Sequence, residues 1–307
     1  MRLHSRLYLN KTQTMAYQHL KGTGVALVTP FQTNGAVDYP ALENLIAHVI
    51  KGGVDFVVAL GTTAETPTLS FQEKQEVLAA VVKNCDGKLP VVCGIGGNNT
   101  AEVLENLKQF DLRGVDAILS VTPYYNKPSQ EGLYQHFKAI ASATSKPIIL
   151  YNVPGRTGGN MLPATVVRLA KEFKNIIAIK EASGNMVQCM ELIHDKPEHF
   201  TVLSGDDNLA LAQMAIGMEG IISVAANCFT KEMTDVINLA IVGKFDKARK
   251  TFYKILPGID LLFAEGNPAG VKCLLHQMNI CEETLRLPLV PVSEATAGKI
   301  TTFMSTL

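Results

Sequence analysis

The residues Ile176 to Ser183 read Ile-Ile-Ala-Ile-Lys-Glu-Ala-Ser, an apolar run bounded by Asn175 and Gly184. Such a run is typical of a strand buried on both faces. Lys180 stands out in it, because an ammonium there must find a partner, reach water or lose its proton. A neutral amine is a nucleophile toward carbonyl carbons. Taken alone, the run favours a lysine at a strand end that points to solvent or pairs with a carboxylate.

Similar runs recur every 20 to 35 residues or so, which is the size of one βα unit. Helix-like segments separate them, with start signals at Ser70 to Glu73, Thr100, Ser129, Pro163, Asn185 and Thr230. This alternation favours an α/β protein with a (β/α)₈ TIM barrel over a doubly wound sheet. The eight predicted strands are Val25 to Thr29, Phe56 to Leu60, Val91 to Ile95, Ala117 to Val121, Ile148 to Val153, Ile176 to Ser183, Val202 to Ser204 and Ile221 to Ala225.

The alternation stops after Val242, and only helices are predicted beyond it. These are Lys244 to Leu256, Gly258 to Phe263, Pro268 to Met278 and Ser293 to Thr306. We therefore expect an N-terminal extension or tag at 1–20, a barrel at 21–242 and a C-terminal helical extension at 243–307 packed on the barrel.

Composition excludes several classes of function. Lys and Arg total 28, as do Asp and Glu, and the sequence pI is about 7.0, so no basic surface for nucleic acid or anionic membrane is expected. No apolar run approaches the roughly 20 residues of a membrane span. The six cysteines show no Cys-x-x-Cys spacing, which is typical of reduced, buried thiols in a cytoplasmic protein. We expect a cytoplasmic protein that acts on small molecules.

Polar residues follow several predicted strands, and in a TIM barrel the active site lies at these carboxyl ends. The second strand leads into Gly61-Thr62-Thr63-Ala64-Glu65-Thr66, a turn that can either cap a helix or cradle an anion. The fourth leads into the adjacent phenols Tyr124 and Tyr125. The fifth ends in Tyr151 and leads into a Gly/Pro loop with Arg156, whose guanidinium suits a carboxylate or phosphate.

The remaining predicted strands narrow the chemistry. Lys180 lies on the sixth, the seventh ends in Ser204-Gly205-Asp206-Asp207, and the eighth carries Ser223. None of the seven histidines ends a strand, and the neighbouring aspartates should face opposite ways, so no metal site is expected. Gly94-Ile95-Gly96-Gly97 lacks the third glycine of a dinucleotide fingerprint, so no cofactor is predicted. Together these features favour Schiff-base chemistry on a keto acid.

Five motifs closely resemble the family of pyruvate-dependent class I aldolases that includes dihydrodipicolinate synthase and N-acetylneuraminate lyase. The resemblance covers about residues 22 to 295, with the motifs in the same order. They are Gly61-Thr62-Thr63-x-Glu65, Thr122 to Gly132 (TPYYNKPSQEG), Leu150 to Gly158 (LYNVPGRTG), Ile179 to Gly184 (IKEASG) and Leu203 to Asp207 (LSGDD).

The resemblance implies condensation of pyruvate with L-aspartate 4-semialdehyde to 4-hydroxy-tetrahydrodipicolinate, in diaminopimelate and lysine biosynthesis. It implies that Lys180 forms an imine with pyruvate, and that Tyr151 relays protons with Thr62 and with Tyr125. In the family the phenol matching Tyr125 reaches into a neighbouring subunit, which implies a homo-oligomer, commonly a dimer of dimers. The implied substrate-binding residues are Thr63 for the pyruvate carboxylate, Arg156 for the semialdehyde carboxylate, Gly205 and Ile222.

Arg156 favours the synthase within the family, because lyases for N-acetylneuraminate or 2-keto-3-deoxy sugar acids typically lack an arginine in this loop. Such a lyase is the first alternative, and a non-catalytic barrel that senses a keto acid is the second.

Two departures from the family pattern carry expectations. Ala64 stands where the family usually has glycine, and we expect it to be tolerated, although a positive φ there would cost about 1 kcal/mol. Lys74 replaces a histidine or an acidic residue at the site where lysine inhibits some members. The other implied effector positions are Thr66, Asn98, Glu102 and Tyr124. A cation at position 74 would repel L-lysine, so weak or no inhibition is expected.

Overall fold

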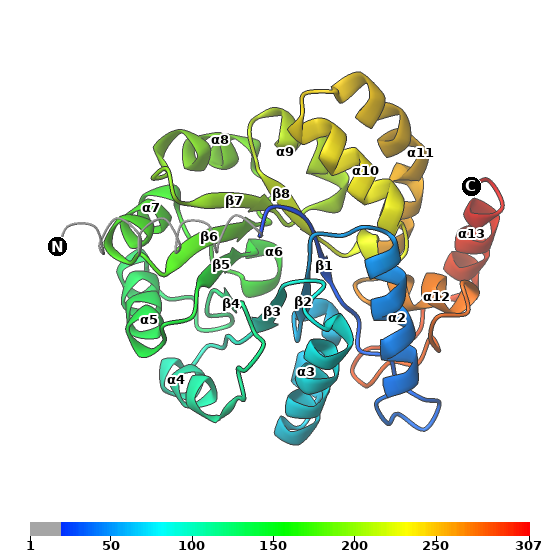
Figure 1. Cartoon of the computed structure of the whole chain (residues 1–307), viewed down its shortest axis with the longest axis horizontal. Helices are drawn as coiled ribbons and strands as arrows, with labels where there is room; N and C mark the ends of the chain where they lie inside the picture. Colours follow the sequence, from blue (N-terminus) through cyan, green and yellow to red (C-terminus); the bar gives the residue numbers. More distant parts are fainter. Residues whose placement is uncertain (1–19) are drawn as a thin grey trace, which may run out of the picture.

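The computed structural model describes residues 20–307, and the extension expected at 1–20 lies outside the described residues except for Leu20. Eight parallel strands form a closed barrel in sequence order, with β8 pairing back to β1 (Figure 1). The predicted TIM barrel is confirmed. The strands are β1 (Gly22–Ala26), β2 (Phe56–Ala59), β3 (Val91–Gly94), β4 (Ala117–Val121), β5 (Ile148–Asn152), β6 (Ile176–Glu181), β7 (Thr201–Ser204) and β8 (Gly220–Ser223).

Helices between the strands surround the barrel (Figure 1). They are α2 (Tyr39–Lys51), α3 (Phe71–Cys85), α4 (Thr100–Gln109), α5 (Gln130–Ala143), α7 (Pro163–Glu172), α8 (Met186–Asp195), α9 (Ala210–Ala215) and α10 (Thr230–Ile241). The capping box predicted at Ser70 and Glu73 is present. The cap of α4 is Asn99, whose side chain accepts the Ala101 N–H, so Thr100 is the first residue inside that helix.

Several boundaries differ from the sequence prediction: β1 ends at Ala26, before the predicted Thr29, and β8 ends at Ser223, before the predicted Ala225. β1 begins at Gly22, before the predicted Val25, and β6 ends at Glu181, before the predicted Ser183. The two helices predicted on either side of Pro257 form one helix, α11 (Phe245–Phe263). Proline usually ends a helix because it lacks an N–H and crowds the preceding turn. Here the buried stripe of Phe252, Ile255, Ile259 and Leu262 continues past it, and its burial favours an unbroken helix.

The chain ends with α12 (Ala269–Gln277) and α13 (Glu294–Met304), which pack with α11 on one side of the barrel, next to α10 (Figure 1). No helix of residues 20–307 is both long enough and apolar enough to cross a membrane.

Two apolar cores hold the strands in place. The larger lies between the outer faces of the strands and the helices, and includes Ile176 and Ile179 of β6. The smaller fills the barrel and includes Phe56, Ile149, Ala178, Leu203 and Ile222. Strand residues alternate between these cores, because successive side chains point to opposite faces.

Candidate active site

Lys180 lies inside the barrel and faces the ring of Tyr151. Ala178, on the same face of β6, belongs to the inner core, whereas Ile179 belongs to the outer one. Tyr151 of β5 is the register partner of Lys180, and the Lys180 Nζ lies 4.5 Å from the centre of its ring. Lys180 is 4% exposed and Tyr151 6%. Among residues 20–307 no carboxylate lies within ion-pair distance of this Nζ. The interpretation that Lys180 points to solvent or pairs with a carboxylate is therefore wrong.

Gly205 follows β7 and lies against the Lys180 side chain. A Cβ at this position would lie 2.9 Å from the Lys180 Cε and 2.6 Å from the Ala182 Cβ, so only glycine fits without a shift. Ile222, the other implied residue on this side, is fully buried in the inner core.

The two aspartates after Gly205 have separate partners. Burial raises the pKa of Asp206, whose carboxylate accepts the Gly184 N–H at 3.1 Å, and the charge of Lys180 acts against that shift. Asp207 is fully enclosed and accepts hydrogen bonds from the Ser223 hydroxyl and from the N–H groups of Val224 and Ala225, while burial raises its pKa. No group of three potential metal ligands occurs within residues 20–307.

The turn after β2 forms a short 3₁₀ helix, η1 (Thr62–Ala64), followed by η2 (Thr66–Thr68). Thr63 is 1% exposed, and its hydroxyl accepts a hydrogen bond from the Asn267 amide at 3.1 Å. The residue in the left-handed conformation is Glu65, with φ 52°, and Ala64 is not among the residues with positive φ. Alanine at position 64 therefore carries no backbone penalty.

Arg156 lies on a loop that a buried carboxylate holds in place. After β5 the chain forms a single turn, α6 (Pro154–Thr157), and Arg156 is exposed on it. Behind this loop, the Glu181 carboxylate accepts hydrogen bonds from Asn152 and Gln188, and the side chains of both contact Asn160 at the end of the loop. Burial raises the pKa of Glu181.

Tyr125 stands apart from the buried residues. Its φ is 72°, its side chain is 88% exposed, and its N–H donates to the carbonyl of Thr157, next to Arg156. Nothing in residues 20–307 encloses the phenol that the resemblance places in the proton relay. The structure thus brings Lys180, Tyr151 and Gly205 together, and leaves Tyr125 and Arg156 on neighbouring exposed loops.

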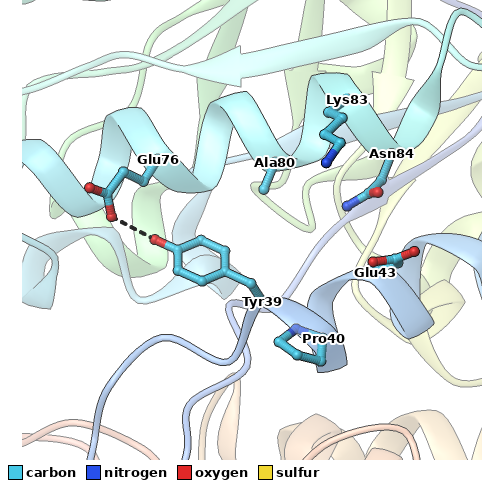
Figure 2. A pocket seen from close by; sticks show the side chains of 7 residues that line it. All are labelled: Tyr39, Pro40, Glu43, Glu76, Ala80, Lys83 and Asn84. Carbon is cyan, nitrogen blue, oxygen red and sulfur yellow. Dashed lines mark hydrogen bonds between the residues drawn. The ribbon is translucent and has the colours of Figure 1, made fainter.

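A hollow of about 470 Å³ lies outside the barrel between α2 and α3. Figure 2 shows the Tyr39 ring at one side of this hollow, with its hydroxyl donating to Glu76 at 2.9 Å. Burial and this hydrogen bond raise the pKa of Tyr39 to about 12. The hollow is also lined by Pro40, Glu43, Ala80, Lys83 and Asn84. None of these residues follows a strand, so we assign the hollow no part in the site.

Residues 19–307 match the model of the Dihydrodipicolinate synthetase family. The chain belongs to this family. It is 51% identical to a 4-hydroxy-tetrahydrodipicolinate synthase of Parabacteroides distasonis over 286 residues, which are 93% of this chain and 96% of that protein.

Two solved structures of the family are similar over nearly the whole chain. One is the chloride-inhibited dihydrodipicolinate synthase of Acinetobacter baumannii complexed with pyruvate, with TM-score 0.91, 42% identity and coverage of 94% of this chain and 98% of that one. The other is described as the first monomeric dihydrodipicolinate synthase variant, with TM-score 0.92, 39% identity and coverage of 94% and 97%.

The positions that the family resemblance assigns to an effector lie on loops and in the first turns of helices, and Asn98 contacts the Tyr124 loop. Asn98 donates to the Tyr124 carbonyl at 3.2 Å, and Asn126 donates back to the Asn98 carbonyl at 2.9 Å. The Thr66 hydroxyl donates to the Gly61 carbonyl. Lys74 and Glu102 lie in the first turns of α3 and α4.

Two buried polar networks of this chain were not predicted from the sequence. One is the hydrogen-bond network around Glu181, behind Arg156, whose residues come from separate strands and helices. The other joins Glu65 to Lys272 of α12 at 2.5 Å. A signal for it existed, because Lys272 lies in the apolar run Ala269 to Leu275 just as Lys180 lies in Ile176 to Ser183.

Proposed function

We propose that the chain condenses pyruvate with L-aspartate 4-semialdehyde to give 4-hydroxy-tetrahydrodipicolinate, the reaction named for its relatives. The observation that carries the proposal is the buried Lys180, which has no carboxylate partner among residues 20–307 and faces a phenol across the β5–β6 pair. An amine in this position can react with the carbonyl carbon of a substrate that enters the barrel.

The first step joins Lys180 to pyruvate. The neutral amine attacks the keto carbon, and the carbonyl oxygen leaves as water with one proton from the amine and one from the proton relay. The resulting iminium acts as an electron sink for the neighbouring methyl group. Loss of a proton from that methyl group gives an enamine. Thr63 would bind the pyruvate carboxylate during these steps, and Gly205 leaves the space that the imine carbon requires beside Lys180.

The second step joins the enamine to the aldehyde carbon of the semialdehyde, whose oxygen takes up a proton. The substrate's own amine then displaces Lys180 from the keto-derived carbon, which closes the ring and frees the enzyme. Arg156 would hold the semialdehyde carboxylate, and a guanidinium on a short turn suits this role because it offers two parallel donors.

Tyr151, Thr62 and Tyr125 would relay the protons. Phenols and hydroxyls serve as proton shuttles when hydrogen bonds order them. Tyr125 is 88% exposed in the single chain, which supports a homo-oligomer, proposed as a dimer of dimers, in which a neighbouring subunit encloses this side chain. Sedimentation analysis tests this: a monomer with full activity would contradict the shared relay.

The test of the proposed function compares two substrate pairs. We expect condensation with pyruvate and L-aspartate 4-semialdehyde, and no lyase activity on N-acetylneuraminate. Arg156→Met should lower activity on the semialdehyde while leaving imine formation with pyruvate intact. Cleavage of a sugar acid at a comparable rate would support the lyase alternative, and no reaction with either pair would support a keto-acid sensor.

We make three further proposals, on inhibition, cellular location and domain organisation. We expect half-maximal inhibition by L-lysine only above about 1 mM, since Lys74 adds a positive charge near the implied effector positions.

We place the protein in the cytoplasm, which free, buried cysteines support. We also retain the division into a barrel at 21–242 and a helical extension at 243–307.

A further inference from the structure

The C-terminal extension contacts the turn after β2 through a fully enclosed ion pair. Both side chains, Lys272 of α12 and Glu65, are 0% exposed, and the Lys272 Nζ lies 2.5 Å from the Glu65 Oε1. The same ammonium donates to the Thr284 carbonyl at 2.8 Å, and the second carboxylate oxygen accepts the Arg286 N–H at 3.0 Å. Burial lowers the pKa of Lys272, and the charge of Glu65 opposes that shift. An ion pair this enclosed holds the two side chains in one geometry, because separating them would leave each charge buried without water or a partner.

Glu65 controls the shape of the turn that carries Thr62 and Thr63. Its backbone is left-handed, with φ 52° and ψ 35°, a conformation that residues with a Cβ rarely adopt. Its N–H closes the turn onto the Thr62 carbonyl at 3.2 Å, and its carbonyl accepts the Thr68 hydroxyl at 2.9 Å. Holding the side chain therefore holds the turn.

A second contact from the extension orients the hydroxyl of Thr63. The Asn267 amide, just before α12, donates to this hydroxyl at 3.1 Å. A threonine hydroxyl has one proton to donate, and among residues 20–307 it donates to no group. Its proton is thus available for an acceptor that enters the site, as a substrate carboxylate does.

We propose that Lys272 is a positioning residue for the pyruvate carboxylate, acting through Glu65 on the turn of Thr62 and Thr63. The inference rests on the proposed function, because it takes Thr63 as the group that binds this carboxylate. The C-terminal extension would thus take part in substrate binding through the contacts that Lys272 and Asn267 make with this turn.

The test measures the pyruvate concentration that half-saturates borohydride trapping, which needs no second substrate. Lys272→Met keeps an unbranched side chain, one atom shorter, and leaves the buried carboxylate without its cation. We expect the half-saturating concentration to rise at least tenfold, with the maximal extent of trapping changed less than threefold. A purely structural role would lower the fraction of active protein and leave half-saturation unchanged.

Two further variants make the result specific. Glu65→Gln with Lys272→Met replaces the ion pair by neutral groups and should return half-saturation to within about threefold of wild type, because no unpaired charge remains. Lys196→Met is the matched control: it removes a lysine paired with Glu219 at 3.0 Å, next to the first residue of β8 and at the opposite end of the barrel. We expect the half-saturating pyruvate concentration of Lys196→Met to differ less than twofold from that of wild type.

The outcomes separate the two proposals. Wild-type protein that traps no pyruvate contradicts the proposed function. Wild-type protein that traps pyruvate, with half-saturation unchanged in Lys272→Met, contradicts the positioning role alone. Should Lys272→Met fail to fold, Glu65→Gln gives the same test, with a rise of at least fivefold expected and an unchanged value overturning the inference.

Discussion

The two halves of the site differ in what holds them. Lys180 and Tyr151 lie on paired strands inside the barrel and are almost completely buried, whereas Tyr125 and Arg156 lie on exposed loops around its rim. The inner half is positioned by backbone pairing and core packing, which a single chain supplies. The outer half is positioned by loops and, in our proposal, by a second subunit. Imine formation should therefore depend on the inner half, and choice of the second substrate on the outer half.

Lys180→Ala should give the largest effect, because it removes the nucleophile. We expect kcat for condensation to fall by roughly 10³-fold or more, with the fold retained. Circular dichroism and steady-state kinetics check this. Lys231→Met, on the outer helix α10, removes a lysine of the surface and should leave kcat unchanged. Activity of Lys180→Ala near that of wild type would show that Lys180 is not the nucleophile.

Tyr151→Phe should lower kcat by about 10²-fold to 10⁴-fold, the usual contribution of a positioned proton-transfer group. The phenyl ring still fills the space in the inner core, so the unfolding midpoint should change little. Tyr125→Phe, its counterpart on the rim, should cost less than Tyr151→Phe. Equal losses in the two variants would contradict the distinction between the halves.

Arg156→Met should act on the second substrate only. Loss of hydrogen bonds to a charged group costs about 1.5–3 kcal/mol, so we expect KM for the semialdehyde to rise roughly 10-fold to 200-fold. KM for pyruvate should stay within about twofold of wild type. A matched rise in both KM values would show that the rim also binds pyruvate.

The smallest effect concerns the contact between the C-terminal segment and α3. Hydrogen bonds from Arg286 lower the pKa of Glu73 to about 2 from an ordinary value of 4.5. The ionised form is thus favoured in the folded state, so its stabilisation is complete above pH 4.5 and disappears as the pH falls toward 2.

Glu73→Gln tests this pH dependence, since glutamine can still complete the capping box of α3. We expect wild type to exceed the variant by roughly 1 kcal/mol in free energy of unfolding at pH 7, and the two to converge as the pH approaches 2. Denaturant unfolding across this range measures it. A constant difference would exclude the titration of Glu73 as its cause.

Much of the fold could be predicted because each strand and most helices carry local signals. The apolar runs located all eight strands, and Ser70, Ser129 and Asn185 marked helix starts correctly. β1 was placed three residues late because Gly22 and Gly24 are weak strand formers that tertiary packing holds in the sheet. Pro257 failed as a breaker because the apolar stripe of α11 continues past it.

The site was predictable only where a residue is unusual in its own segment. Lys180 was found because an ammonium is out of place in a buried strand. Glu65 and Lys272 are 207 residues apart, and nothing local to Glu65 shows that its carboxylate is paired. The Asn152 and Glu181 contact likewise depends on the register of two strands, which the closed barrel fixes and a local pattern does not contain.

The most direct test of the central claim is borohydride reduction of the protein in the presence of pyruvate, followed by peptide mass analysis. We expect a mass gain of one reduced pyruvyl group on the peptide that contains Lys180, present in wild type and in Arg156→Met and absent in Lys180→Ala. A wild-type protein without this gain, or with the gain on a different lysine, would contradict it.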